Sequence, residues 1–214
     1  MLLIVGGSCD CRRVGAAYAF SAPTNGVDVQ DSCLTLFIEL VVGHPIMPKG
    51  LKETSSIIQI GASVVESAPG TFTSSRVDLQ LNPLDNEVFV VYAVDLDAKT
   101  PELIPATNTQ NKLSISTTER SSVGSIADSN VLGQMATVVQ EAGGAAVINM
   151  KTPGETPPAM LPYVGIIATN DFFVNIQGVN NVSTMSGFVR LYGVRARADA
   201  NIYAALVQSE LLSA

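Results

Sequence analysis

The sequence predicts an all-β fold: a single jelly roll or β-sandwich of about eight to ten strands, with one internal helix and a C-terminal helix. Three observations lead to this prediction. Segments rich in Val, Ile, Phe and Thr recur along the 214 residues, and Gly, Pro, Asn and Ser separate them. A helix does not follow nearly every strand, as a parallel α/β fold would require. We therefore expect residues 1–214 to form one jelly-roll domain.

Apolar density and alternation predict the strands. Four segments are apolar enough for the interior of a sheet: residues 2–5, 34–42, 57–65 and 87–95. Three more alternate apolar and polar residues, which is typical of strands with one buried face: residues 77–81, 113–117 and 172–176. Residues 188–198 carry apolar groups on both faces until Arg195 and Arg197, so we expect them to form a central strand.

Proline-containing stretches mark the loops, because proline cannot donate to a β-ladder. They fall at residues 43–50, 82–85, 100–105 and 152–162. The last stretch holds four prolines: Pro153, Pro157, Pro158 and Pro162. A proline-rich segment loses little chain entropy when it is held extended. We expect this stretch to form an external arm that makes an interface with a neighbouring subunit.

The internal helix is predicted from a change of period. Asp128 can cap it, and Gly143 with Gly144 can end it. The apolar residues between them recur at helical spacing: Val131, Leu132, Met135, Val138, Val139 and Ala142.

The second predicted helix begins at Asp199 and runs toward the C-terminus. Its apolar residues include Tyr203, Leu206 and Val207. These three side chains either seal the chain's own sandwich or dock on a neighbouring subunit, since apolar terminal segments rarely remain free in water. The sequence does not decide between the two.

Composition argues against several classes of protein. The net charge is −7, and Lys and Arg are not clustered as a phosphate-tracking surface requires, so we expect no direct sequence-specific binding of nucleic acid. No apolar run approaches the roughly 18 residues of a membrane span. Arg12 and Arg13 follow the apolar residues 1–5 rather than precede them, which argues against a signal peptide.

The sequence offers few groups for catalysis or metal binding. His44 is the only histidine, and no Gly-x-Ser-x-Gly elbow accompanies it. Cys9, Cys11 and Cys33 do not supply the four ligands of a structural zinc site; they form a disulfide or remain free thiols. We expect no catalytic residue, no cofactor and no metal.

Acidic residues gather near one predicted strand. Asp95 and Asp97 share a face at its end, with Asp85 and Glu87 in the preceding loop. Such carboxylates could hold Ca²⁺ or serve as the acid and base of a glycosidase. Solvation of a strand end is the stronger interpretation, because Asp-x-Asp is a frequent pattern and no EF-hand spacing accompanies it.

The C-terminal part of the chain carries a family resemblance. Its sequence runs from Phe188-Val189-Arg190-Leu191-Tyr192-Gly193 through Arg195-Ala196-Arg197-Ala198-Asp199 into Tyr203-Ala204-Ala205-Leu206. Together with residues 89–117, this sequence pattern resembles that of the single-β-barrel major capsid proteins of icosahedral archaeal and bacterial viruses with an internal membrane, the sphaerolipovirus-like group. The resemblance covers about half of the chain.

The resemblance implies a vertical single jelly roll whose copies form capsomers, beside a second related capsid protein, over a lipid vesicle that surrounds the genome. It implies no catalytic residue. We therefore expect a virion structural protein, a capsid subunit that self-assembles into an icosahedral shell. The alternative is a receptor- or carbohydrate-binding β-sandwich of a spike, fibre or decoration module, which the absence of Trp disfavours. An enzyme using Asp95 and Asp97 ranks last.

Overall fold

The computed structural model describes residues 47–151 and 161–213. All of these belong to one unit of the chain, residues 45–214. The strands predicted at residues 2–5 and 34–42, the three cysteines and His44 lie outside the described residues, as do Pro153, Pro157 and Pro158. The expectation of one domain over residues 1–214 therefore stays a prediction.

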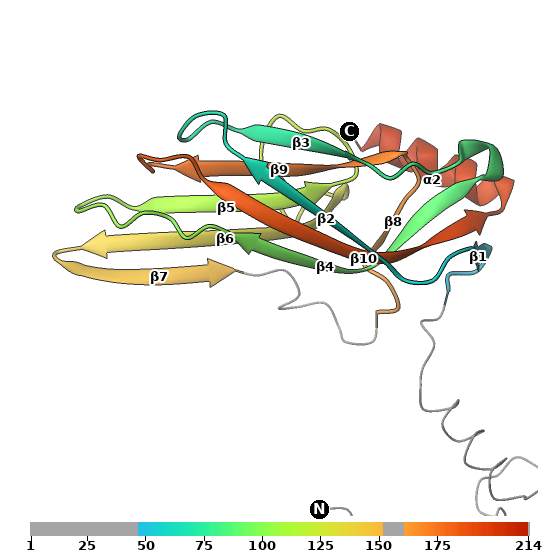
Figure 1. The fold of residues 1–214 in the computed structure, drawn as a ribbon, viewed down its shortest axis with the longest axis horizontal. Helices are drawn as coiled ribbons and strands as arrows, with labels where there is room; N and C mark the ends of the chain where they lie inside the picture. The colour runs from blue at the N-terminus through green and yellow to red at the C-terminus, as the bar shows by residue number, and fades with distance from the viewer. Residues whose placement is uncertain (1–46, 152–160, 214) are drawn as a thin grey trace, which may run out of the picture. The chain divides into compact units, whose positions relative to one another are not determined.

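The described residues form ten strands, one short 3₁₀ turn and one helix (Figure 1). The helical elements are η2 (Pro83–Asp85) and α2 (Ala200–Leu212). The strands are β1 (Leu51–Glu53), β2 (Ile58–Val65), β3 (Thr73–Asp78), β4 (Glu87–Ala98), β5 (Thr109–Ser116), β6 (Val131–Ala142), β7 (Ala145–Lys151), β8 (Gly165–Ile167), β9 (Asp171–Val179) and β10 (Ser186–Ala198). The prediction of an all-β sandwich with a C-terminal helix is confirmed.

The strands form two five-stranded antiparallel sheets. The first, sheet A, has the order β2-β10-β4-β8, and β1 pairs with the far end of β10 on the same side as β2. The second, sheet B, has the order β3-β9-β5-β6-β7. Without β1 and β7, the chain alternates between the sheets except at β5 and β6, which are consecutive in sheet B, and it returns its last strand beside its first. This is the connectivity of a jelly roll. β10 lies between β2 and β4, so the prediction of a central strand is confirmed.

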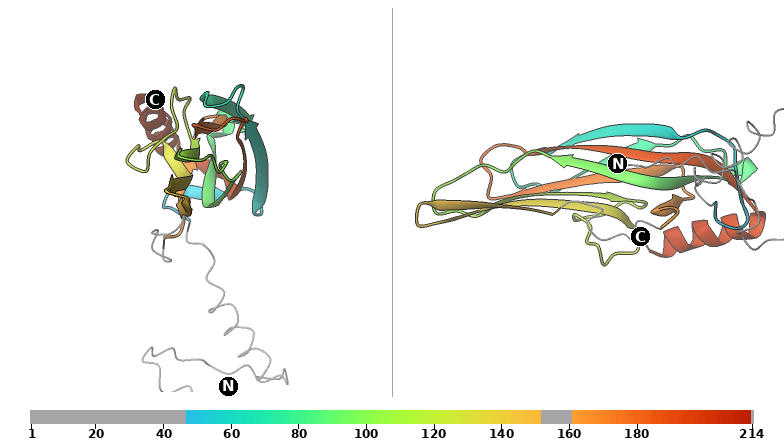
Figure 2. Two further views of the ribbon diagram at one scale, coloured as in Figure 1. Left: turned by 90° about the vertical axis from the view of Figure 1, so that its left-hand side faces the viewer. Right: turned by 90° about the horizontal axis from the view of Figure 1, so that it is seen from below.

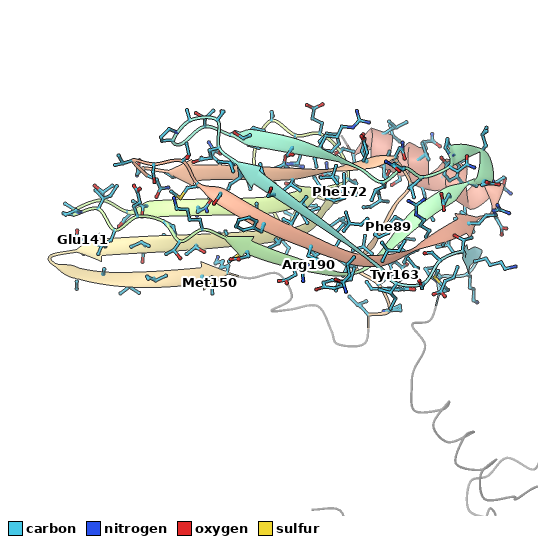
Figure 3. The ribbon with its side chains drawn as sticks, in the orientation of Figure 1. Phe89, Glu141, Met150, Tyr163, Phe172 and Arg190 are labelled. Atoms are coloured by element: carbon cyan, nitrogen blue, oxygen red, sulfur yellow. The ribbon has the colours of Figure 1, made fainter. Side chains whose placement is uncertain are left out.

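The main core lies between the two sheets and comes from alternating residues of the strands. In β9, Phe172, Val174 and Ile176 are fully buried, as their period of two predicts. From sheet A, Phe89 and Leu191 pack into the same cluster. Phe89 and Phe172 come from opposite sheets (Figure 3).

A second apolar cluster lies on the outer face of sheet A. Val88 and Val90 alternate along β4 with the core residues Phe89 and Val91, so their side chains point away from the sandwich. The register of β4 and β10 shifts between Tyr192 and Gly193, as in a β-bulge.

Helix α2 packs against this outer cluster. Figure 2 shows the helix beside one end of the strands. Its Tyr203, Leu206 and Val207 are half-buried against sheet A of their own chain. One turn further on, the buried Glu210 accepts hydrogen bonds from the backbone N–H groups of residues 168 (3.0 Å) and 169 (2.9 Å). Burial raises the pKa of Glu210 above its ordinary value, against these hydrogen bonds. The helix thus seals the chain's own sandwich; whether it also contacts a neighbour stays a prediction.

The internal helix predicted between Asp128 and Gly143 is wrong. Val131–Ala142 is strand β6, which pairs with β5 and β7. β-branched residues at 137–139 and Gly133 in the middle weaken a helix, and the apolar residues pack against two neighbouring strands instead. Asp128 caps no helix; its carboxylate accepts hydrogen bonds from Arg120 and from the backbone of Ser125, both at 2.8 Å.

The glycine pair is a hairpin turn and not a helix stop. Gly143 and Gly144 have φ values of +62° and +86°. Two consecutive residues of positive φ between antiparallel strands form a type I′ turn, whose twist matches that of the strands. Since Ala142 pairs with Ala145, the two glycines make the whole loop between β6 and β7.

Candidate functional site

The acidic residues singled out in the sequence do not converge on one site. Asp95 and Asp97 are exposed on one face of β4, where the register places them opposite Arg190 and Phe188 of β10. Across residues 47–151 and 161–213, no group of three His, Cys, Asp or Glu side chains is arranged to hold a metal ion.

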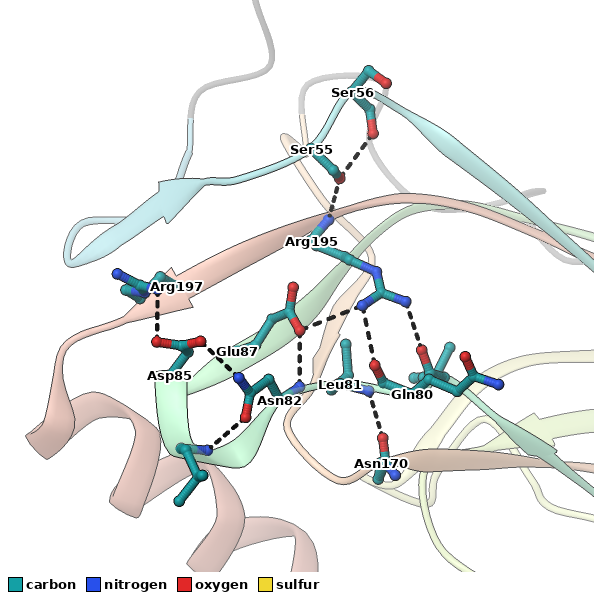
Figure 4. Close-up of polar contacts among 12 residues, drawn as sticks. Ser55, Ser56, Gln80, Leu81, Asn82, Asp85, Glu87, Asn170, Arg195 and Arg197 are labelled. Carbon is teal, nitrogen blue, oxygen red and sulfur yellow. Dashed lines mark hydrogen bonds and ion pairs between the residues drawn. The ribbon is translucent and has the colours of Figure 1, made fainter.

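Asp85 and Glu87 bind arginines of β10 (Figure 4). Arg197 contacts the carboxylate of Asp85 at 2.8 Å. Arg195 contacts the carboxylate of Glu87 at 3.4 Å and donates to the carbonyl oxygen of Leu79 at 2.9 Å. The two arginines therefore tie the loop between β3 and β4 to β10. Asp85 and Glu87 are each paired with an arginine of the same chain, so their role is structural.

Other carboxylates bind backbone N–H groups where loops meet strand ends. The buried Glu66 accepts from the N–H groups of Gly178 (2.5 Å) and Met185 (2.8 Å). The exposed carboxylate of Glu102 accepts from the N–H of Val182 at 2.7 Å and from the hydroxyl of Ser183. That hydroxyl contact, followed by the backbone contact, lowers the pKa of Glu102. The sequence carries no local signal for these contacts, because their partners lie far away along the chain.

Asn181 opens an Asn-Val-Ser triplet of the glycosylation type, but its amide serves the fold. The side chain is only 8% exposed. Its amide nitrogen donates to the carbonyl oxygen of Gln110 at 2.9 Å, and its oxygen accepts from the N–H of Glu102 at 3.1 Å. Attachment of a glycan would remove one of the two N–H donors that now bond to the carbonyl oxygens of Gln110 and Val179.

The edge strand β7 is the most unusual surface of the described fold. All of its residues are exposed; Val147 and Ile148 are each 62% exposed and Met150 is 54% exposed. β7 pairs with β6 on one side, and no other described strand pairs with its second edge. Figures 1 and 3 show β7, with Met150, at the border of sheet B. An exposed apolar strand whose second edge has no partner among the described strands is typical of a site that pairs with another chain.

The sequence analysis did not predict β7 or its exposure. The signal that could have found it is the Gly143-Gly144 pair, which marks a two-residue hairpin when extended segments flank it. Of the predicted interface arm, Pro162 is described and exposed, and the other three prolines lie in residues 152–160, outside the description. That arm stays a prediction.

A second exposed surface lies on the outer face of sheet A, away from α2. Phe188 of β10 is 55% exposed there. On the same face, Arg190 donates to the hydroxyl of Tyr192 at 3.5 Å, and the two carboxylates of β4 lie alongside. The surface therefore combines an exposed aromatic ring with charged and hydroxyl groups.

Comparison of the sequence with protein-family models and with curated proteins finds no match. Among the helices of the described ranges, none has the length and apolar character needed to cross a membrane.

Proposed function

We propose that the chain is a virion structural protein, a jelly-roll capsid subunit that self-assembles into an icosahedral shell. The observation that carries the proposal is the exposed, apolar edge strand β7 on a sandwich with jelly-roll strand order. Jelly rolls occur in capsid proteins, lectins and cupins, so the strand order alone does not select a function. An apolar edge is a liability for a solitary protein, whereas a shell subunit covers it with its neighbours.

The low charge of the chain supports the same proposal. Charged residues make up 14% of the sequence, against about 25% in an ordinary soluble domain. Burying a charge in an interface carries a desolvation cost, while neutral polar and apolar groups are buried more cheaply. Several of the described charges are already paired within the fold, as at Arg195 and Arg197. Much of the surface can therefore be buried in an interface without burying an unpaired charge.

The resemblance to capsid proteins of internal-membrane viruses supplies the rest of the proposal. The copies would form the capsid of a virion together with other capsid proteins, over an internal membrane. The proline-rich arm at residues 152–162 would reach neighbouring subunits, and its deletion would impair assembly without unfolding the sandwich.

Electron microscopy of the purified full-length chain tests the proposal. The chain is expected to form closed particles of uniform diameter, alone or with its companion capsid protein. Circular dichroism of the same sample would verify that the sandwich is folded. Folded chains that stay monomeric at all concentrations, with and without that companion, would contradict the proposal, and so would open filaments.

The outer face of sheet A favours a second candidate, a carbohydrate- or receptor-binding module. An exposed aromatic ring beside polar groups is the usual platform for a sugar ring, and Phe188 with Arg190 and Tyr192 provides one. A glycan array probed with soluble protein tests it, with Phe188→Ala as the variant and Val65→Ala of β2 as the control. A signal that Phe188→Ala abolishes would favour this candidate, and an array without signal would exclude it.

A further inference from the structure

The free edge of β7 presents a defined set of backbone groups. In a two-residue hairpin, the residues that flank the turn exchange hydrogen bonds with each other. Ala142 and Ala145 are that pair here. Along β7, the N–H and C=O groups of Ala145, Val147 and Asn149 therefore point toward β6. The groups of the alternate residues, 146, 148 and 150, point outward from the sheet.

We propose that β7 pairs antiparallel with β7 of a second copy of this chain, about a two-fold axis at Ile148. This inference deepens the proposed function and takes its biological setting from it. An antiparallel pair must join outward-pointing residues to outward-pointing residues, which places the axis at a residue rather than between two residues. Ile148 is the middle one of the three outward-pointing residues of β7, so an axis there uses all three in the pairing. With the axis at Ile148, the backbone of Ile148 exchanges two hydrogen bonds with Ile148 of the second copy. The backbone of Ala146 does the same with Met150 of the second copy.

The side chains are self-complementary in this register. Ile148 meets Ile148, Ala146 meets Met150, and Val147 meets Asn149, so no charges of like sign face each other. Lys151, the one charged residue of β7, lies opposite Ala145 of the second copy. The pairing extends sheet B into one sheet that runs through both copies. It covers apolar side chains that the single chain leaves 54–62% exposed.

β2 is the contrasting edge. Among the strands that the structure describes, it pairs with β10 alone, so it also lies at the border of its sheet. Its solvent-facing residues 59, 61 and 63 are Gln, Gly and Ser. The apolar Val65, which is 56% exposed, lies at the end of the strand. These residues offer little apolar surface for a second copy to cover. We therefore assign the pairing to β7, and β2 provides the control.

The test uses a charge swap at the proposed axis in the full-length chain. Ile148→Lys and Ile148→Glu would each place like charges opposite one another and weaken self-association at least about tenfold. Mixing the two variants would restore it, because residue 148 faces itself only in this register. Val65→Lys, a comparable change on β2, would leave self-association unchanged. Sedimentation velocity, at concentrations below those that form particles, measures the self-association of the three variants and of the Ile148→Lys and Ile148→Glu mixture.

A variant that changes the backbone provides an independent test. Ile148→Pro removes an N–H that points away from β6, so the hairpin and the melting temperature are retained while the pairing is lost. Self-association that survives both Ile148→Lys and Ile148→Pro overturns the inference. So does a mixture of Ile148→Lys and Ile148→Glu that stays as weak as its parts, or a wild-type chain that is monomeric throughout.

The outcomes also separate this inference from the proposed function. Shells formed by Ile148→Lys would leave the capsid proposal standing and exclude pairing through β7. Wild-type pairs that depend on Ile148, in a preparation that never forms shells, would support the pairing and count against the capsid.

Discussion

Glu102 shows how one exposed carboxylate can hold two distant loops. It lies before β5 and binds Val182 and Ser183, which lie between β9 and β10. Its pKa is lowered from the ordinary 4.5, chiefly by the Ser183 hydroxyl. The folded state therefore binds fewer protons at this carboxylate than the unfolded state does. Its contribution to stability is fully present above pH 4.5 and is lost as the pH falls through the folded-state pKa.

Glu102→Gln is expected to lower the melting temperature modestly at about pH 7 and to lower it less at about pH 3, below the unfolded-state pKa. The amide keeps the size of the side chain but accepts weaker hydrogen bonds from Val182 and Ser183. Thermal unfolding followed by circular dichroism at both pH values measures the difference. The exposed Glu119→Gln is a control for the loss of one negative charge. A difference between wild type and Glu102→Gln that persists undiminished at about pH 3 would show that the ionised form plays no part.

The hairpin of β6 and β7 is the element on which both proposals depend. Its turn needs positive φ at Gly143 and Gly144, and a Cβ added at either glycine would meet no atom within 4 Å. Backbone conformation alone therefore decides which residues these two positions accept. Asn tolerates the left-handed region, whereas a β-branched residue does not.

Gly143→Asn is expected to leave stability within about 0.5 kcal/mol of wild type, because Asn-Gly is the preferred type I′ sequence. Gly144→Val is expected to cost about 1–2 kcal/mol, because valine at positive φ is strained. Urea unfolding of the two variants measures both values. Equal stability of the two would mean that this turn is not of type I′.

The elements that local pattern could predict are those with a dense apolar run or with a clear alternation of apolar and polar residues. Residues 57–65 and 87–95 correspond to β2 and β4, and α2 begins directly after Asp199, as predicted. β6 was missed because its apolar spacing fits both a helix and a strand packed between two neighbours. The Asp85–Arg197 pair was not predictable, since it depends on the register of β4 with β10 across more than half of the described chain.

At the scale of the whole molecule, net charge opposes the association of copies. Each chain carries a net charge of −7, so packing many copies side by side accumulates repulsion. The surface proposed for pairing, β7, carries one lysine and no carboxylate. In the proposed pairing, apolar contact and backbone hydrogen bonds would therefore drive association, and net charge would act against it.

Added salt is expected to promote assembly of the full-length chain. The screening length falls from about 10 Å at 0.1 M to about 3 Å at 1 M, which weakens repulsion between copies and leaves apolar contacts intact. Static light scattering across this range of NaCl measures the trend. Particles that dissolve as NaCl rises would instead indicate interfaces held by ion pairs.

The place of β10 has a consequence for the order of events during synthesis. β10 separates β2 from β4 in sheet A, so those two strands have no common neighbour until residues 186–198 have left the ribosome. The outer cluster of Val88 and Val90 also waits for β10 and for α2, which follows it. Sheet A and its outer cluster therefore stay incomplete until β10 and α2 have emerged, whereas sheet B has all of its strands once residues 171–179 have emerged.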